Sequence, residues 1–285
     1  MPPQDSALRL VRVVAYCALT FSLMPVQAVL LALQSPLAKR LPRSYHRLVC
    51  RILGITIELY GTPSPVRPTL FVANHTSYLD IEILGAAIPG SFVSKADVDG
   101  WPLFGWLARL QRTVFIDRKR RSVTRQRDAL STRLREGDQL VLFPEGTSGD
   151  GQHLLPFKSA LFAAVMESDG AGDIAVQPVS VAYLRLDGMP LGRSYRPLFA
   201  WYGDMDLVPH LWTMLGLGHL GVSVTFHLPV RAADFASRKA LADHCAAVIA
   251  AGLSVALSGR EAPMPLPVTI PTEPAPVLAD ALPTR

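Results

Sequence analysis

A histidine and an aspartate are the residues whose types and spacing best suit catalysis. His75 and Asp80 stand in the segment NHTSYLD, residues 74–80, directly after an apolar run typical of a buried strand. On one continuous helix their side chains would diverge, but they can meet if His75 lies in the turn before a helix and Asp80 in its first turns. The carboxylate would then hold one imidazole tautomer and leave the other nitrogen free to take a proton. The pair could serve as a general base and the group that orients it, but this spacing alone is more typical of a structural histidine.

Three further segments place polar residues at predicted strand ends or bends. VFIDR, residues 114–118, ends in Arg118, which can hold an anion or be one more surface arginine of a basic stretch. FPEGTS, residues 143–148, contains a proline and a glycine that force a tight turn, so backbone N–H groups and the Thr147 hydroxyl can face a ligand. VQPV, residues 176–179, has a proline inside a strand, which marks either a bend that lines a site or an edge strand.

After Gly61, short apolar runs alternate with helix-like stretches. This alternation predicts an α/β fold with a mostly parallel mixed sheet flanked by helices. Ligands of such folds bind at the carboxyl ends of strands, where the histidine segment lies. The expected strands are Thr69–Ala73, Phe92–Lys95, Val114–Asp117, Gln139–Phe143, Ile174–Ala182 and Val222–Val230. The expected helices are Ile81–Ala87, Ser122–Glu136, Lys158–Glu167 and Ala240–Leu257.

The amino-terminal run Val13–Leu33 has no charged residue and is long enough, at roughly 20 residues, to cross a bilayer. It predicts a hydrophobic helical membrane anchor. The anchor either spans the bilayer or, kinked at Pro25, pairs with a basic helix around Arg43–Ile57 and dips into one leaflet. We expect an anchor and basic helix at 1–58, a catalytic domain at 59–260 and a disordered Pro/Ala-rich tail at 261–285. A second apolar stretch, Leu207–Gly221, is either a loop with a buried helix or a further lipid-facing patch.

Composition narrows the functional classes. Hydrophobic residues make up 49% of the chain, charged residues only 18%, and the net charge is +5, which favours an anionic membrane surface as partner. No nucleic-acid motif accompanies the basic residues, so a nucleic-acid binder is not expected. The three cysteines, Cys17, Cys50 and Cys245, form no CxxC pair, so we expect neither a disulfide frame nor a metal site. An esterase would need a G-x-S-x-G elbow, which the sequence lacks.

Together, the four segments resemble the glycerolipid acyltransferase family, specifically the lysophosphatidic acid (1-acylglycerol-3-phosphate) O-acyltransferase type. NHTSYLD matches the family's N-H-x-S-x-x-D block in full, and VFIDR, FPEGT and VQPV resemble its second, third and fourth blocks. Lys95 in SKADV and Lys158 in PFKSA also lie in segments similar to the family's. The resemblance covers Thr69 to Val181.

The resemblance implies an O-acyltransferase that moves a fatty acyl chain from acyl carrier protein or coenzyme A to the free hydroxyl of a lysolipid, without a cofactor or metal. His75 would be the base of a direct transfer, and Asp80 would orient it. The protein would lie at the cell inner membrane with its catalytic domain on the cytoplasmic side. The residues implied in substrate binding are Arg118, Lys95, Glu145, Gly146, Thr147 and Asn74.

One position departs from the family pattern. The third block usually continues F-P-E-G-T-R, whereas Ser148 stands here in place of the arginine. The loss of a phosphate-binding cation puts lysophosphatidic acid in doubt as the sole acceptor. The F-P-E-G-T-S form resembles bacterial enzymes that acylate lyso-ornithine lipid, an acceptor with an amide-linked 3-hydroxy fatty acid and no phosphate.

A non-catalytic, membrane-anchored lysolipid-binding protein is the main alternative to an enzyme. Such a protein would need the same headgroup pocket. It would not need a base whose tautomer is fixed by a carboxylate, so the intact pair of His75 and Asp80 favours the enzyme.

Overall fold

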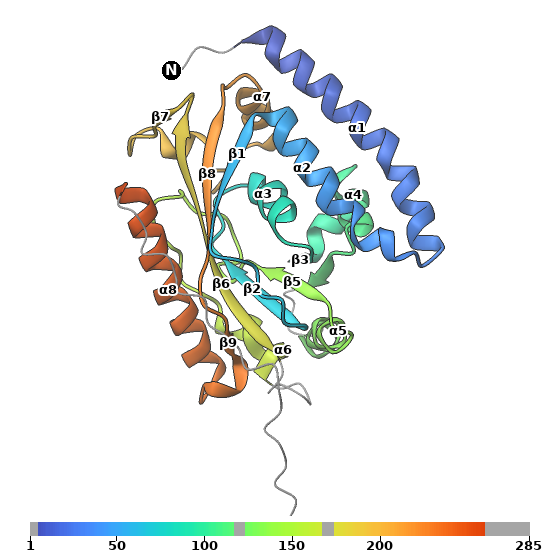
Figure 1. The fold of residues 1–285 in the computed structure, drawn as a ribbon, viewed down its shortest axis with the longest axis vertical. Coiled ribbons are helices and arrows are strands. Elements are labelled where there is room, and N and C mark those ends of the chain that lie inside the picture. Colours follow the sequence, from blue (N-terminus) through green and yellow to red (C-terminus); the bar gives the residue numbers. More distant parts are fainter. Residues whose placement is uncertain (1–4, 117–122, 167–173, 260–285) are drawn as a thin grey trace, which may run out of the picture.

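The computed structural model describes residues 5–116, 123–166 and 174–259, and its centre is one mixed sheet (Figure 1). In the seven-strand path β1-β8-β6-β2-β5-β3-β4, only the β6–β8 pair is antiparallel, and the short strands β7 and β9 pair antiparallel with β6. The predicted fold class is therefore confirmed. The strands are β1 (Ile55–Tyr60), β2 (Thr69–Ala73), β3 (Ser91–Lys95), β4 (Val114–Ile116), β5 (Gln139–Leu142), β6 (Ala175–Leu186), β7 (Met189–Pro190), β8 (Leu220–Phe226) and β9 (Val230–Arg231).

Helices cover both faces of the sheet and bury two apolar cores, one on each face (Figure 1). One core packs α2 (Leu41–Leu53) and α3 (Leu79–Ala87) on the sheet, and its largest fully buried side chains include Phe71, Phe199 and Phe226. The other core joins α5 (Val123–Arg135), α6 (Ala163–Met166) and α8 (Arg238–Ser258) to the opposite face. The remaining α-helices are α1 (Ser6–Ala32), α4 (Phe104–Leu110) and α7 (Leu207–Leu215). β2, the strand before His75, is buried along its whole length.

The amino-terminal helix α1 lies against α2, α4 and α7 with its polar side chains inward (Figure 1). Arg12 donates to the carbonyls of Leu215, Leu217 and Gly218, and Gln27 donates to those of Ala38 and Leu110. The large apolar side chains that α1 exposes are Leu10, Val11, Val14, Phe21, Val26 and Val29. The predicted anchor run is thus a helix with a polar stripe toward the protein and an apolar face toward the outside. Pro25 lies within α1 without ending it.

The prediction of one basic helix around Arg43–Ile57 is wrong beyond Leu53. The helix ends there because Gly54 adopts a left-handed conformation with φ of 71°. The residues that follow, ITIELY, form β1, which pairs in parallel with β8 at the edge of the sheet. This segment alternates β-branched and polar residues, a strand pattern that the preceding helix obscured.

Pro178 does not mark an edge strand, since β6 lies between β8 and β2. Two strands pair with β6 on the side away from β2. β9 pairs with the residues before Pro178, and β8 pairs with the residues after it. The Pro178 carbonyl accepts a hydrogen bond from the His227 N–H on that side, so the missing proline N–H falls at the break between the two strands.

Gly85 lets α2 approach α3 closely, because a Cβ there would lie 2.4 Å from Cδ2 of His46. The His46 ring cannot easily move away, since Nδ1 lies 2.6 Å from Glu82 Oε2 and Nε2 lies 2.7 Å from Gln111 Oε1. Gly85→Ala should cost about 1–3 kcal/mol of stability through overpacking. The measurement is the midpoint of thermal unfolding in detergent, which should fall by several degrees.

Gly100→Ala is the matched control, because no atom lies within 4 Å of its Cβ position. Its unfolding midpoint should match that of the wild type. Equal midpoints for the Gly85 variant and the wild type would contradict the tight α2–α3 contact.

Candidate active site

The His75 and Asp80 side chains meet as the sequence predicts. His75 follows the end of β2 by two residues, and Asp80 is in the first turn of α3. His75 Nδ1 lies 2.8 Å from Asp80 Oδ2. Because Nδ1 faces a carboxylate, it carries the proton, and Nε2 is the nitrogen with a free lone pair. Nε2 has no hydrogen bond to any residue that the structure describes.

Asp80 is completely buried and accepts hydrogen bonds from four groups. Its Oδ2 accepts from the backbone N–H groups of Thr76 and Ser77, at 2.7 and 2.9 Å, as well as from His75. Its Oδ1 accepts from the Tyr183 hydroxyl at 2.6 Å. These donors satisfy the buried carboxylate and come from two chain segments, the histidine turn and β6.

The imidazole of His75 stacks on the ring of Phe143, with ring centroids 4.2 Å apart and an angle of 20° between the planes. Phe143 directly follows β5 and begins the FPEGTS turn. The His75 side chain keeps 20% of its surface exposed, whereas that of Asp80 has none. The ring is therefore held on one face and at Nδ1, while the side chain stays partly exposed.

Glu145 ties the FPEGTS turn to the histidine turn. Its Oε1 accepts the backbone N–H of His75 at 2.7 Å, and its Oε2 accepts that of Leu155 at 2.9 Å. Burial raises the pKa of Glu145 to about 7, although these two hydrogen bonds favour the charged form. The Glu145 side chain therefore fixes the main chain at His75 and Leu155.

Asn74 is buried, and both polar atoms of its amide bond the backbone of Val181, at 2.9 and 2.8 Å. It therefore joins the end of β2 to β6. Gly146, with φ of 71°, and the exposed Thr147 lie in the turn after Glu145, and Lys95 is the last residue of β3. Arg118 lies outside the described residues. Binding roles for these predicted residues stay predictions.

Sequence reasoning missed Tyr183 and Phe143. A signal for Tyr183 exists, because it continues the alternation Val179, Val181, Tyr183 on one buried face of β6. A tyrosine in a buried strand needs a partner for its hydroxyl, and a nearby carboxylate supplies one. The stacking of Phe143 has no local signal, since it depends on β2 and β5 being neighbours.

Ser148 is buried and donates a hydrogen bond to the Trp201 carbonyl. The backbone N–H of Trp201 in turn donates to the Thr76 carbonyl at 3.0 Å. The position that departs from the family pattern thus holds a loop against the histidine turn and carries no positive charge.

Comparison with known proteins identifies the family. A family model described as Acyltransferase matches residues 56–182. A lyso-ornithine lipid O-acyltransferase of Brucella abortus is 45% identical over 88% of this chain and 96% of its own length. This chain belongs to the acyltransferase family. A 1-acyl-sn-glycerol-3-phosphate acyltransferase of Neisseria gonorrhoeae is 34% identical to this acyltransferase over 71% of the chain and 79% of its own length.

The fold of this acyltransferase has a solved counterpart. The crystal structure of the 1-acyl-sn-glycerophosphate (LPA) acyltransferase of Thermotoga maritima matches with a TM-score of 0.58 at 23% identity, covering 79% of this chain and 81% of that one. The matched family region contains all four motifs, including the strand ends around His75. Family membership and the apolar helix α1 make this acyltransferase a membrane-associated protein.

The raised pKa of Glu145 predicts a pH-dependent stability. The folded carboxyl binds its proton more tightly than the unfolded one, so its contribution is fully present below the ordinary pKa of 4.5 and is lost as pH rises through about 7. Glu145→Gln removes this titration. The unfolding free energy of the wild type minus that of the variant should therefore fall between these pH values, by at most about 3 kcal/mol.

Unfolding midpoints of both proteins in detergent, from acidic to mildly alkaline pH, measure this difference. A difference that stays constant or rises across the interval would contradict the buried, proton-binding carboxyl.

Proposed function

We propose that this acyltransferase moves a fatty acyl chain from acyl carrier protein or coenzyme A directly to the hydroxyl of lyso-ornithine lipid. The observation that carries the mechanism is the His75 imidazole, whose Nδ1 is held by Asp80 and whose Nε2 is free among the described residues. No side-chain nucleophile is required, because the acceptor supplies its own hydroxyl. Cys50 and Cys245 are buried, and Cys17 lies in α1, away from the motifs.

His75 Nε2 takes the proton of the acceptor hydroxyl while its oxygen attacks the thioester carbonyl. The C–S bond then breaks, and the imidazolium returns the proton to the leaving thiolate. Asp80 stabilises the imidazolium between these steps and keeps the ring in one tautomer. General base assistance of this kind contributes about 10²–10⁴-fold to the rate.

The identity of the acceptor rests on Ser148 and on the relatives. The site lacks the arginine that the phosphate-acylating pattern places after Thr147, and Ser148 is used to hold Trp201. Relatives named lyso-ornithine lipid O-acyltransferase match at 45% and 41% identity, against 34% for the 1-acyl-sn-glycerol-3-phosphate acyltransferase of Neisseria gonorrhoeae. An acceptor without a phosphate fits a site without that cation.

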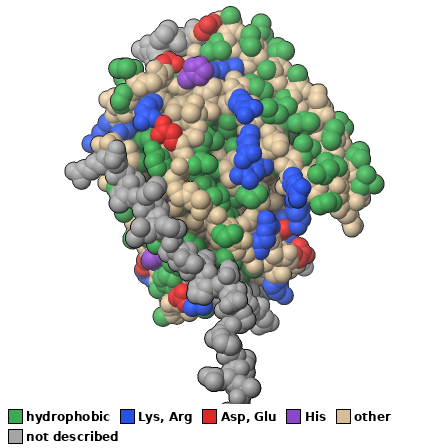
Figure 2. Space-filling model, in the orientation of Figure 1, with side chains coloured by type: hydrophobic (Ala, Val, Ile, Leu, Met, Phe, Trp, Pro, Cys, Tyr) green, Lys and Arg blue, Asp and Glu red, His purple; other side chains and the backbone are tan. Residues whose placement is uncertain are grey.

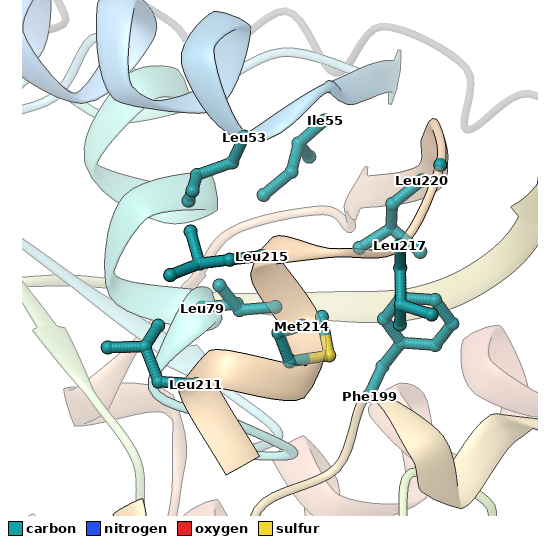
Figure 3. A pocket seen from close by; sticks show the side chains of 10 residues that line it. Leu53, Ile55, Leu79, Phe199, Leu211, Met214, Leu215, Leu217 and Leu220 are labelled. Atoms are coloured by element: carbon teal, nitrogen blue, oxygen red, sulfur yellow. The ribbon is translucent and has the colours of Figure 1, made fainter. Parts of the chain in front are cut away.

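A small apolar pocket, with about 20 Å³ of open space, lies next to α3 and marks the proposed entrance for the acyl chain. Figure 3 shows Leu79, next to Asp80 in α3, facing Leu211 and Met214 of α7. The other apolar side chains that line the pocket are Leu53, Ile55, Phe199, Leu215, Leu217 and Leu220. Since α7 also contacts α1, this pocket lies next to the helix with the exposed apolar face. An acyl chain would enter here from the membrane side once the lining side chains move apart.

The membrane attachment follows from the polar stripe of α1. Within the described ranges, two helices, α1 and α8, are long and apolar enough to cross a membrane, but α8 buries Leu241, Cys245 and Ile249 in the core. The hydrogen bonds of Arg12 to Leu215 and of Gln27 to Leu110 hold both ends of α1 to the catalytic domain. We therefore place α1 along the bilayer surface, with its apolar face in one leaflet, on the cytoplasmic side of the inner membrane.

His75→Ala should lower the rate of acyl transfer by about 10²–10⁴-fold, because no other group takes the hydroxyl proton. The assay is thiol release from the acyl donor in the presence of lyso-ornithine lipid. His153→Ala is the control, since His153 also pairs with an aspartate, Asp150, but its side chain is 65% exposed. That variant should keep the wild-type rate. Turnover of the His75 variant at the wild-type rate would refute the role of the base, whereas a wild type that releases no thiol would favour a lipid-binding function.

A competition assay tests the acceptor. When lyso-ornithine lipid and lysophosphatidic acid are offered at equal concentration, product masses should show mainly acylated ornithine lipid. Ser148→Arg should raise the share of phosphatidic acid, because it adds a cation at the acceptor site. Ser148→Ala, which removes the bond to Trp201 without adding charge, should leave the ratio unchanged. Mainly phosphatidic acid from the wild type would contradict the proposed acceptor.

A further inference from the structure

A second cavity, of about 500 Å³, lies under the junction of the amino-terminal helices with the sheet. Its walls come from the 3-10 helix η1 (Pro36–Lys39), the first turn of α2, and the start of β3 and β5. Ser91 and Gln139, which line it, are the first residues of their strands. The cavity therefore opens at the amino-terminal edge of the parallel strands, whereas His75 lies beyond their carboxyl ends. The length of β2 alone, five residues, puts roughly 15 Å between the two edges.

The lining of this cavity is strongly basic. It contains five cationic side chains and one carboxylate, that of Asp138. Asp138 already accepts hydrogen bonds from Lys39, Arg112 and Arg133. The three cations that remain are Arg40, Arg43 and Arg67.

These three arginines are open to an anionic ligand. Arg43 donates to the carbonyls of Ala86 and Ala87 at the end of α3, which satisfies hydrogen bonds but leaves its charge without a counterion. Arg40 and Arg67 are exposed and have no ion pair among the residues that the structure describes. Guanidinium groups bind phosphate oxygens in a bidentate manner, so three at one cavity suit a phosphate group.

The backbone adds to this positive field. α2 is 13 residues long, and no side chain caps its amino terminus, where Arg40 is the N-cap residue. Pro42, Arg43 and Ser44 of this first turn line the cavity. The positive end of the helix dipole therefore faces the same space as the arginines.

The surroundings indicate that the phosphate belongs to a lipid. Leu33 and Leu37, at the end of α1 and in η1, are 72% and 52% exposed, and Leu37 stands between the lining residues Pro36 and Ala38. Figure 2 shows basic side chains in a row over α2, beside hydrophobic side chains over the end of α1. An apolar rim next to a basic cavity matches a molecule with acyl chains and an anionic headgroup.

We propose that this cavity binds the phosphate headgroup of an anionic phospholipid of the membrane, at a site separate from the one that carries out acyl transfer. The chains of the lipid lie along the exposed apolar residues at the end of α1. Its phosphate bridges Arg40, Arg67 and the first turn of α2. The bound lipid thereby holds the amino-terminal helices and the catalytic sheet at the membrane surface.

Flotation of the full chain with vesicles tests the site. The vesicles are phosphatidylcholine alone, or three parts phosphatidylcholine to one part phosphatidylglycerol. The wild type should bind more tightly to the second kind, and Arg40→Gln/Arg67→Gln should lose about 30-fold of that affinity, at about 1 kcal/mol per arginine. Arg231→Gln/Arg238→Gln removes two exposed charges near the start of α8 and should bind as the wild type does.

Hydrogen exchange gives a local readout. Phosphatidylglycerol vesicles should slow exchange of the amides of Leu41, Arg43 and Ser44 in the wild type and in His75→Ala, but not in Arg40→Gln/Arg67→Gln. The His75 variant separates this site from the acyl-transfer reaction. Equal binding to both vesicle types, or an equal loss in the control pair, would overturn the proposal.

Two further arms test other sources of the anion. If glycerol 3-phosphate alone slows the same amides, the site binds a free phosphate ester and the lipid assignment is wrong. The assignment is also wrong if the arginine variant keeps its vesicle affinity but loses transfer from acyl carrier protein, because the arginines would then dock an acidic protein.

Discussion

The structure around the active site depends on the burial of one carboxylate, that of Asp80. A buried charge is tolerated only where hydrogen bonds replace its water, and here four donors do so. They come from the histidine turn, whose backbone wraps the carboxylate, and from Tyr183 in β6. Folding the sheet and α3 therefore brings the donors together, and the orientation of the imidazole results from the same contacts. The imidazole is positioned before any substrate arrives.

The histidine turn is also held from outside. Asn74 binds it to β6, Glu145 accepts the His75 N–H, and the Gly149 N–H donates to the His75 carbonyl at 2.8 Å. The turns after β2 and β5 are thus joined through hydrogen bonds between main chain and side chain. Asn74 and Glu145 lie in the predicted substrate-binding motifs, but their side chains bond main-chain groups of the protein. A motif residue can thus be needed to build the turn as well as to contact the ligand.

Local patterns predicted the elements whose signal lies within a few residues. The strand before His75, the helix beginning near Asp80 and the meeting of the two side chains all follow from apolar runs and a turn. The sequence could not place Tyr183 beside Asp80 or Phe143 beside His75, since both contacts arise from strand pairing between distant segments. It also missed β1, because helix-like residues precede it and its pairing partner, β8, is more than 150 residues away.

The amino-terminal helix shows what composition leaves out. Its apolar content predicts an anchor, and the structure adds that two of its arginines, Arg9 and Arg12, are buried against the protein. A charged group is unfavourable in hydrocarbon but is stabilised where backbone carbonyls surround it. The carbonyls of Leu215 and Leu217, at and just after the end of α7, stabilise Arg12 in this way. The helix is thus apolar on the side away from the protein and polar on the side toward it. Such a helix attaches to the domain and to a lipid surface at once, which brings the pocket beside Asp80 close to the membrane that supplies the lysolipid.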